Sequence, residues 1–116
     1  MNLIVLTGRI ATDPDIRESK GKKVANFNLA VDRRTEKKET DFIRCTAFSK
    51  TAEVIENWCF KGQQVGIKGR IQTGSYTDKE GRTIYTTDII IELLDIFEFK
   101  PKTENNEADP DDGLPY

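Results

Sequence analysis

The amino-acid sequence predicts a mainly β domain with the layout of a small Greek-key barrel, in which one helix lies between the third and fourth of five strands. Three observations predict it. Apolar and polar residues alternate with a period of two in several runs, as they do in half-buried strands. Residues 51–61 contain no glycine or proline and have helical spacing instead. A segment rich in carboxylates, residues 101–116, follows the barrel as an acidic tail.

The first two strands are expected at residues 3–10 and 25–31. The first is an apolar run that ends at the turn-prone residues 12–15. The second alternates cleanly, and its apolar face carries Ala25, Phe27, Leu29 and Val31. A charged connection, residues 32–40, should form a short hairpin loop to the third strand.

The third expected strand, residues 41–48, has two unusual faces. The face suited to a core carries Ile43, Cys45 and Ala47. The opposite face carries Phe42, Arg44, Thr46 and Phe48. Exposed aromatic rings next to a cation form a stacking platform for unpaired bases. The alternative is that one or both phenylalanines pack under a loop or at a subunit interface, since phenylalanine is usually buried. Arg44 between them favours the binding interpretation.

The expected helix has its apolar side chains on two neighbouring stripes. Ala52, Ile55 and Cys59 share one face, with Val54 and Trp58 beside them, and Gly62 is a suitable stop. This spacing favours packing of Trp58 against the helix over contact with a ligand.

The last two strands should form a hairpin, residues 64–76 and 83–99, around a turn at residues 77–82. In the fourth strand the inward residues are Val65, Ile67, Gly69 and Ile71, and the polar face carries Lys68, Arg70, Gln72 and Tyr76. In the fifth strand one face carries Tyr85, Thr87, Ile89, Ile91 and Leu93, which alternate with Ile84, Thr86, Asp88, Ile90 and Glu92. Its second face also has Ile84 and Ile90, which indicates a buried position, an oligomer contact, or scattered surface isoleucines.

The charge balance limits the classes of partner. The chain has 18 basic and 20 acidic side chains, a net charge of −2. The tail holds five carboxylates and one lysine, so the first hundred residues have 17 basic and 15 acidic side chains, a balance of +2. Such a body is not polybasic, and nucleic-acid binding would depend on where its charges lie.

Other features of the composition argue against metal binding and secretion. Cys45 and Cys59 do not form a metal-type pair, and the chain has no histidine, so no metal or cofactor is expected. Reduced thiols suggest a cytosolic protein. The apolar run Leu3–Leu6 is too short for a signal peptide or a membrane span. A cytoplasmic protein without membrane contact is therefore expected.

The first hundred residues resemble the bacterial and phage single-stranded DNA-binding (SSB) proteins. The resemblance rests on the order and spacing of these segments: Leu6–Ile10, Asp13–Arg17, Val24–Val31, Phe42–Glu53, Lys61–Val65, Gly69–Ile71, Tyr76–Asp78 and Tyr85–Thr87. It implies an OB-fold domain over residues 1–100, a homotetramer, and binding of single-stranded DNA during replication, recombination and repair.

The resemblance also implies roles for individual residues. Phe42, Phe48 and Tyr76 match positions of stacking aromatics, and Arg44, Lys50 and Lys61 match positions of phosphate-contacting cations. The other candidate cations for nucleic-acid binding are Arg9, Arg17, Arg33, Arg34, Lys68 and Arg70. The sequence departs from the family where Thr35 replaces a frequent aromatic, and where Gly74 and Ser75 replace frequent basic residues.

Residues 101–116 should be a solvated, mobile tail, because they have too little apolar surface to offset the entropy of ordering. The expected partner-binding residues are Asp109, Asp111, Asp112, Leu114, Pro115 and Tyr116. Family tails end in several aspartates and Ile-Pro-Phe and dock on replication, recombination and repair enzymes, so the resemblance implies the same role here. The alternative is an acidic tail that only increases solubility.

Two other functions remain open. Some OB-folds are nucleases, but this chain has no metal-type carboxylate cluster, no histidine for acid–base chemistry and no phosphate-binding glycine loop. A binding protein is therefore expected, and not an enzyme. A replication-restart or RNA-binding OB module is the second alternative, although it would have no use for the acidic tail.

Overall fold

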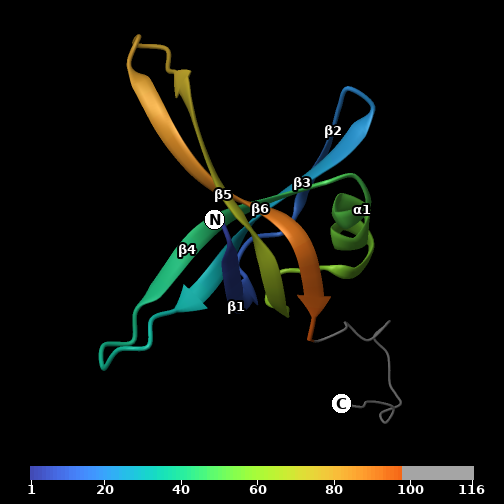
Figure 1. The fold of residues 1–116 in the computed structure, drawn as a ribbon, viewed down its shortest axis with the longest axis vertical. Coiled ribbons are helices and arrows are strands. Elements are labelled where there is room, and N and C mark those ends of the chain that lie inside the picture. Colours follow the sequence, from blue (N-terminus) through green and yellow to red (C-terminus); the bar gives the residue numbers. More distant parts are fainter. Residues whose placement is uncertain (98–116) are drawn as a thin grey trace.

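The computed structural model describes residues 1–97, which form six strands and one helix (Figure 1). In chain order the elements are β1 (Ile4–Ile10), β2 (Asp15–Ser19), β3 (Lys22–Asp32), β4 (Thr40–Phe48), α1 (Ser49–Trp58), β5 (Gln64–Thr77) and β6 (Thr83–Ile96). The helix lies between β4 and β5, as expected from the sequence. No helix within residues 1–97 is long and apolar enough to cross a bilayer.

The strands form one sheet that closes on itself. Their order is β1-β5-β6-β4-β3-β2, and an additional pairing of β1 with β3 joins the two sides of the sheet. All pairs are antiparallel except β4 with β6, which run parallel where Cys45 faces Ile89 and Thr46 faces Ile90. The predicted closed barrel, an OB-fold, is therefore confirmed.

The alternating residues of the strands fill the barrel. The buried cluster comprises Ile10, Ala25, Phe27, Leu29, Cys45, Ala47, Ala52, Ile55, Val65, Ile67, Ile89 and Ile91. Ala52 and Ile55 come from α1, which contacts β3, β4 and β6. The helix ends at Trp58, three residues before the predicted end, and the backbone N–H of Cys59 donates to Ile55 O at 3.0 Å.

Two glycines allow the strands to approach closely. A Cβ on Gly8 would lie 2.3 Å from Ala30 O, at the point where β1 meets β3. A Cβ on Gly69 would lie 2.0 Å from Ile90 O, between β5 and β6. Both neighbours are backbone atoms that cannot rotate away, so only glycine fits at these two crossings.

An irregularity beside Gly69 changes which face each β6 residue occupies. Gly69 pairs with Ile91, but Lys68 pairs with Leu93, so one extra residue of β6 is inserted at Glu92. A bulge of this kind reverses the alternation beyond it. Leu93 is therefore exposed, whereas Leu94 is partly buried and packs against the core. The predicted alternation, which placed Leu93 on one face with Ile89 and Ile91, is wrong at Leu93 for this reason.

Strand β2 was not among the five predicted strands. Its residues show no clear alternation, and only Ile16 is partly buried and packed against the core. It forms because Lys20 and Gly21, at φ 53° and 81°, make a two-residue turn that lays β2 along β3. Here the pairing partner determines the structure more than the local pattern does.

Three hairpins project from the barrel in different directions (Figure 1). One is β2–β3, the second is the β3–β4 connection at residues 33–39, and the third is the long β5–β6 hairpin. In the part of β5–β6 beyond the barrel, here called the arm (residues 73–87), both faces carry exposed side chains and none is fully buried. The arm therefore includes Tyr85, which is exposed although it was predicted on one face with Ile89 and Ile91.

The two isoleucines on the second face of β6 have different environments. Ile90 is buried, with Thr46 beside it on β4 and Arg70 beside it on β5. Ile84 lies on the arm and is half-buried. At Ile90, the apolar second face is therefore explained by the central position of β6 in the sheet of a single chain.

Candidate nucleic-acid interface

The outward sides of β2 to β6 form one continuous surface, which we call the aromatic–arginine face. Residues that pair across neighbouring strands lie on the same side of a sheet. Phe48 pairs with Val24, and Val24 pairs with Arg17 on β2. The face consists of Arg17, Phe42, Arg44, Phe48, Arg70, Tyr76 and the residues between them.

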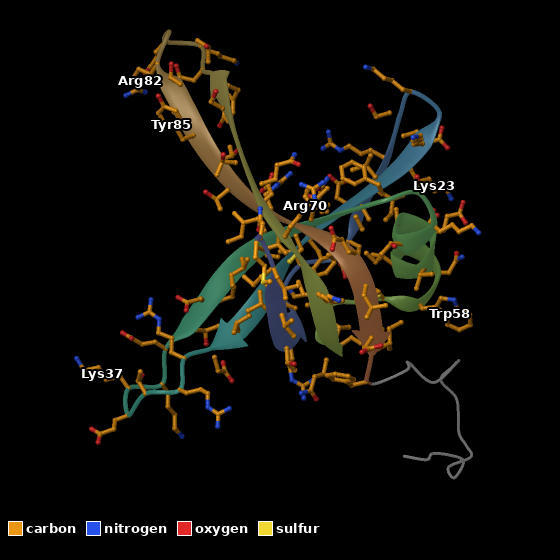
Figure 2. All side chains as sticks on the ribbon, viewed as in Figure 1. Lys23, Lys37, Trp58, Arg70, Arg82 and Tyr85 are labelled. Atoms are coloured by element: carbon orange, nitrogen blue, oxygen red, sulfur yellow. The ribbon has the colours of Figure 1, made fainter. Side chains whose placement is uncertain are left out.

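The remaining members of the face follow from the register on the other side of β4. Thr46 pairs with Ile90, and Ile90 pairs with Arg70, which lies where β5 and β6 cross the sheet (Figure 2). Tyr76 is on the same side of β5 as Arg70, six residues further along, where it pairs with Ile84. The face therefore extends from the barrel along one side of the arm.

Three aromatic side chains of this face are exposed. The exposed fractions are 66% for Phe42, 44% for Phe48 and 57% for Tyr76. Neither phenylalanine is buried within the chain, so packing under a loop does not explain them. Between the phenylalanines, Thr46 is buried, and its hydroxyl donates to Asn26 Oδ1 at 2.8 Å. The exposed rings can stack on unpaired bases, which is the chemistry that such a surface supports.

Each arginine of the face has a carboxylate neighbour. Arg17 Nε lies 3.0 Å from Asp15 Oδ2, and Arg44 Nε lies 3.2 Å from Asp88 Oδ1. Arg70 Nε lies 3.5 Å from Glu92 Oε2, and its Nη1 donates to Gln72 Oε1 at 2.8 Å. The carboxylates were not identified as part of the site from the sequence. Asp15 and Arg17 are two residues apart on β2, a strand that was not predicted, and Asp88 and Glu92 become neighbours of their arginines only through strand pairing or the bulge.

Other predicted cations lie near the face. Arg9 pairs with Ala30, the same residue that pairs with Phe42, and its Nη1 donates to Gly62 O at 2.9 Å. Lys50 is exposed at the start of α1, two residues after Phe48. Lys61 is exposed in the turn after the helix, next to Gly62. These three positions extend the positive charge from the edge of the face towards the helix.

Lys68 lies on β5, two residues before Arg70, and its paired neighbours are apolar. It pairs with Val5 on one side and with Leu93 on the other, and both of these side chains are exposed. Its surroundings are therefore apolar, unlike those of the other predicted cations.

The two arginines of the β3–β4 loop differ in their contacts. Arg33 donates to Asp41 from Nε and Nη2, at 3.0 and 2.8 Å, and to Glu39 from Nη1 at 2.8 Å. The hydrogen bond raises the pKa of Arg33 and lowers the pKa of Asp41. Arg34 is exposed and forms no ion pair with residues 1–97. Arg33 therefore holds the loop, and Arg34 is the accessible cation.

Two aromatic residues differ from the sequence interpretation. Trp58 was expected to pack against the helix, yet half of it is exposed and it lies on the outer side of α1 (Figure 2). Tyr85 is 81% exposed on the arm, on the side opposite to Tyr76 (Figure 2). Alternation alone could not identify it, because the inward side of a strand is exposed where the strand leaves the barrel.

The partner-binding residues predicted in the acidic tail lie outside the described residues. They are Asp109, Asp111, Asp112, Leu114, Pro115 and Tyr116. Within residues 1–97, no group of three or more histidine, cysteine, aspartate or glutamate side chains is placed to hold a metal ion.

Comparison with known proteins places this surface in a family. Residues 1–97 match the model of the single-strand binding protein family. A single-stranded DNA-binding protein of Clostridium perfringens is 45% identical over 100 residues, which cover 84% of this chain and 67% of that protein. Single-stranded DNA-binding protein 4 of Streptococcus agalactiae is 40% identical over 121 aligned positions, covering 99% of this chain and 86% of that protein.

A solved structure agrees with the fold. The structure described as the Plasmodium falciparum SSB complex with ssDNA has a TM-score of 0.76 and 29% sequence identity, and the match covers 84% of this chain and 96% of that one. The family model thus matches the whole described barrel, and the relatives agree with it. The chain belongs to the single-strand binding protein family.

Proposed function

We propose that this chain is a single-stranded DNA-binding protein that coats unpaired strands without sequence preference. The observation that carries the proposal is the aromatic–arginine face, where three exposed aromatic rings and three arginines lie on one side of the sheet. Bases of any sequence can stack on such rings, and each linkage supplies a phosphate for a cation. Membership of the family supports a role in replication, recombination and repair.

In this proposal the aromatic residues and the cations have separate roles. Phe42, Phe48 and Tyr76 stack on bases. The phosphate contacts come from Arg9, Arg17, Arg34, Arg44, Lys50, Lys61 and Arg70. Arg33 supports the loop that carries Arg34, and Lys68 is a peripheral contact.

Alanine variants of the stacking residues test the proposal. Phe48→Ala and Tyr76→Ala should each weaken binding to poly(dT) by roughly 1–3 kcal/mol, the usual contribution of one base–aromatic stack. Tyr85→Ala is the matched control, since it removes an even more exposed ring from the opposite side of the same arm. Parent-like affinity of both Phe48→Ala and Tyr76→Ala, measured by fluorescence titration, would contradict the assignment of this face.

We propose binding without catalysis. Incubation of a labelled oligonucleotide with the protein and Mg²⁺ or Ca²⁺ tests this directly, because a nuclease would shorten the oligonucleotide and a binding protein would leave it intact.

The acidic tail is proposed as a docking segment for replication, recombination and repair proteins. Its aspartates would approach a basic surface while Leu114, Pro115 and Tyr116 fill a pocket. Deletion of residues 109–116 should abolish capture of these enzymes and leave affinity for DNA unchanged or slightly higher. Loss of DNA affinity with retained capture would reverse this assignment.

We also propose a homo-oligomer, with the tetramer as the expected form, in the cytoplasm where single-stranded DNA is exposed. The exposed apolar residues Val5 and Leu93, which flank Lys68, support association. The particle mass measured by light scattering at micromolar concentration should exceed 13.2 kDa, the mass of one chain. A particle of that mass would reject the proposal.

A further inference from the structure

Every arginine of the aromatic–arginine face is already engaged by a carboxylate of the same chain. Three separate pairs show it: Arg17 with Asp15, Arg44 with Asp88 and Arg70 with Glu92, at 3.0, 3.2 and 3.5 Å. The formal charges of these six side chains cancel. The centre of the face is thus a stacking surface with nearly balanced charge, and not a uniformly positive groove.

Asp88 and Glu92 are positioned by the sheet itself. Asp88 pairs with Gln72 on β5, which places it on the side of β6 that carries Ile90 and faces Arg44. Its side chain is only 26% exposed, whereas that of Arg44 is 57% exposed. The contacting oxygen of Asp88, Oδ1, is buried and has no hydrogen-bond partner within residues 1–97, and the guanidinium is the more accessible member of the pair.

A phosphate group would compete for the same donors. Carboxylate and phosphate oxygens both accept hydrogen bonds from the guanidinium fork. The Arg70–Glu92 pair is exposed on both sides, and exposed ion pairs contribute little stability, so Arg70 can exchange its carboxylate for a phosphate at a small cost. At Arg44 the same exchange costs more, because the contacting oxygen of Asp88, Oδ1, is buried. The carboxylate that is left still repels the phosphate at short range. Both the competition for the arginine and the repulsion of the phosphate weaken the binding of DNA.

We infer that Asp88 and Glu92 are intramolecular competitors of the DNA phosphates for Arg44 and Arg70. They hold the two arginines while no strand is bound, lower the affinity of the face for single-stranded DNA, and return to the arginines as a phosphate leaves. The dissociation of the strand is faster as a result. This inference rests on the proposed function, because it assigns a role to carboxylates within the proposed binding face.

The opposite role is that these carboxylates orient the arginines for DNA. The two roles predict opposite signs when the charge is removed. Asp88→Asn and Glu92→Gln keep the shape of each side chain and one acceptor oxygen but remove the anion. If the carboxylates compete, both variants bind more tightly, and if they orient, both bind less tightly.

The experiment measures binding of a (dT) oligomer to the full chain over a range of salt concentrations. Asp88→Asn and Glu92→Gln should each tighten binding about two- to five-fold at low salt, the range that corresponds to one exposed ion pair. Each should steepen the plot of log K against log salt by about 0.7, because one more phosphate contact is formed with a single strand. The dissociation rate in stopped flow should fall by a similar factor.

Asp95→Asn is the matched control for net charge. Asp95 is on the same strand beyond the bulge, is exposed, and forms no ion pair with residues 1–97. A second control combines Arg44→Ala with Asp88→Asn. If Asp88 acts through Arg44, its removal should have little further effect once the arginine is gone.

The possible outcomes are separable. Failure of the parent protein to bind the (dT) oligomer would reject the proposed function. Binding by the parent, with Asp88→Asn and Glu92→Gln no tighter than Asp95→Asn, would reject only the competition. Thermal unfolding of each variant checks the fold, and Glu92→Gln, at a half-exposed position, decides the question if Asp88→Asn is unstable.

Discussion

Replacement of Gly69 by alanine should destabilise the barrel more than any other glycine-to-alanine change on β5. The added methyl group would lie 2.0 Å from Ile90 O and 2.9 Å from Ile90 C. Non-bonded carbon atoms pack at about 3.5–4.0 Å, so β5 and β6 would have to separate by more than an ångström. That movement would break the pairing on both sides of the bulge. We expect a loss of about 3 kcal/mol, at the upper end of the range for overpacking.

The matched control is Gly74→Ala on the arm of the same strand. Its methyl group would meet only Thr86 Oγ1, at 3.2 Å, and that side chain can rotate. Thermal unfolding followed by circular dichroism at one fixed protein concentration is the appropriate measurement, because subunit association would make Tm depend on concentration. For a domain of this size, 3 kcal/mol corresponds to a decrease in Tm of about 12–24 °C. Equal Tm values for the two variants would refute the argument from close strand approach.

Two further sets of predictions concern the buried thiols and the arginines of the β3–β4 loop. Burial raises the pKa of Cys45 to about 12 and that of Cys59 to about 11, so at pH 8 both thiols should react slowly with a thiol reagent in the folded protein and quickly in urea. Because the folded pKa values are raised, the free energy of unfolding should fall as the pH rises from about 9 to about 11, and a constant value would contradict the burial. Arg34→Ala should reduce the salt slope of DNA binding by about 0.7, whereas Arg33→Ala should change it less, since carboxylates already hold Arg33. An equal reduction by both variants would show that the loop ion pairs open on binding.

The sequence predicted the barrel well where strands alternate between core and solvent. Residues 25–31 are an example, since Ala25, Phe27 and Leu29 are all buried. It failed at β2, where the short strand has one partly buried residue and exists because it pairs with β3. It also failed at Leu93, since no local pattern reveals a bulge that depends on the close approach of Gly69 to Ile90.

The candidate site was predicted only in part, because its contacts also depend on strand pairing. Phe42, Phe48 and Tyr76 were identified as exposed rings, and the structure confirms their exposure. Their roles in binding stay predictions. The contacts of the cations could not be predicted. Arg44 and Asp88, for example, meet across neighbouring strands but are 44 residues apart in the chain. Pairing across a sheet brings together residues whose separation in sequence carries no signal.

The number of cations near a binding face is therefore a poor measure of the phosphate contacts it can make. Arg17, Arg44 and Arg70 each have a carboxylate within 3.5 Å, whereas Lys50 and Lys61 form no ion pair with residues 1–97. Only the unpaired cations attract phosphate without first giving up a partner. The salt dependence of binding should then reflect the unpaired cations most strongly, and the stacked rings should provide a larger share of the affinity that persists at high salt. A protein with this distribution can stay on single-stranded DNA through its aromatic rings while its arginines exchange between phosphate and carboxylate.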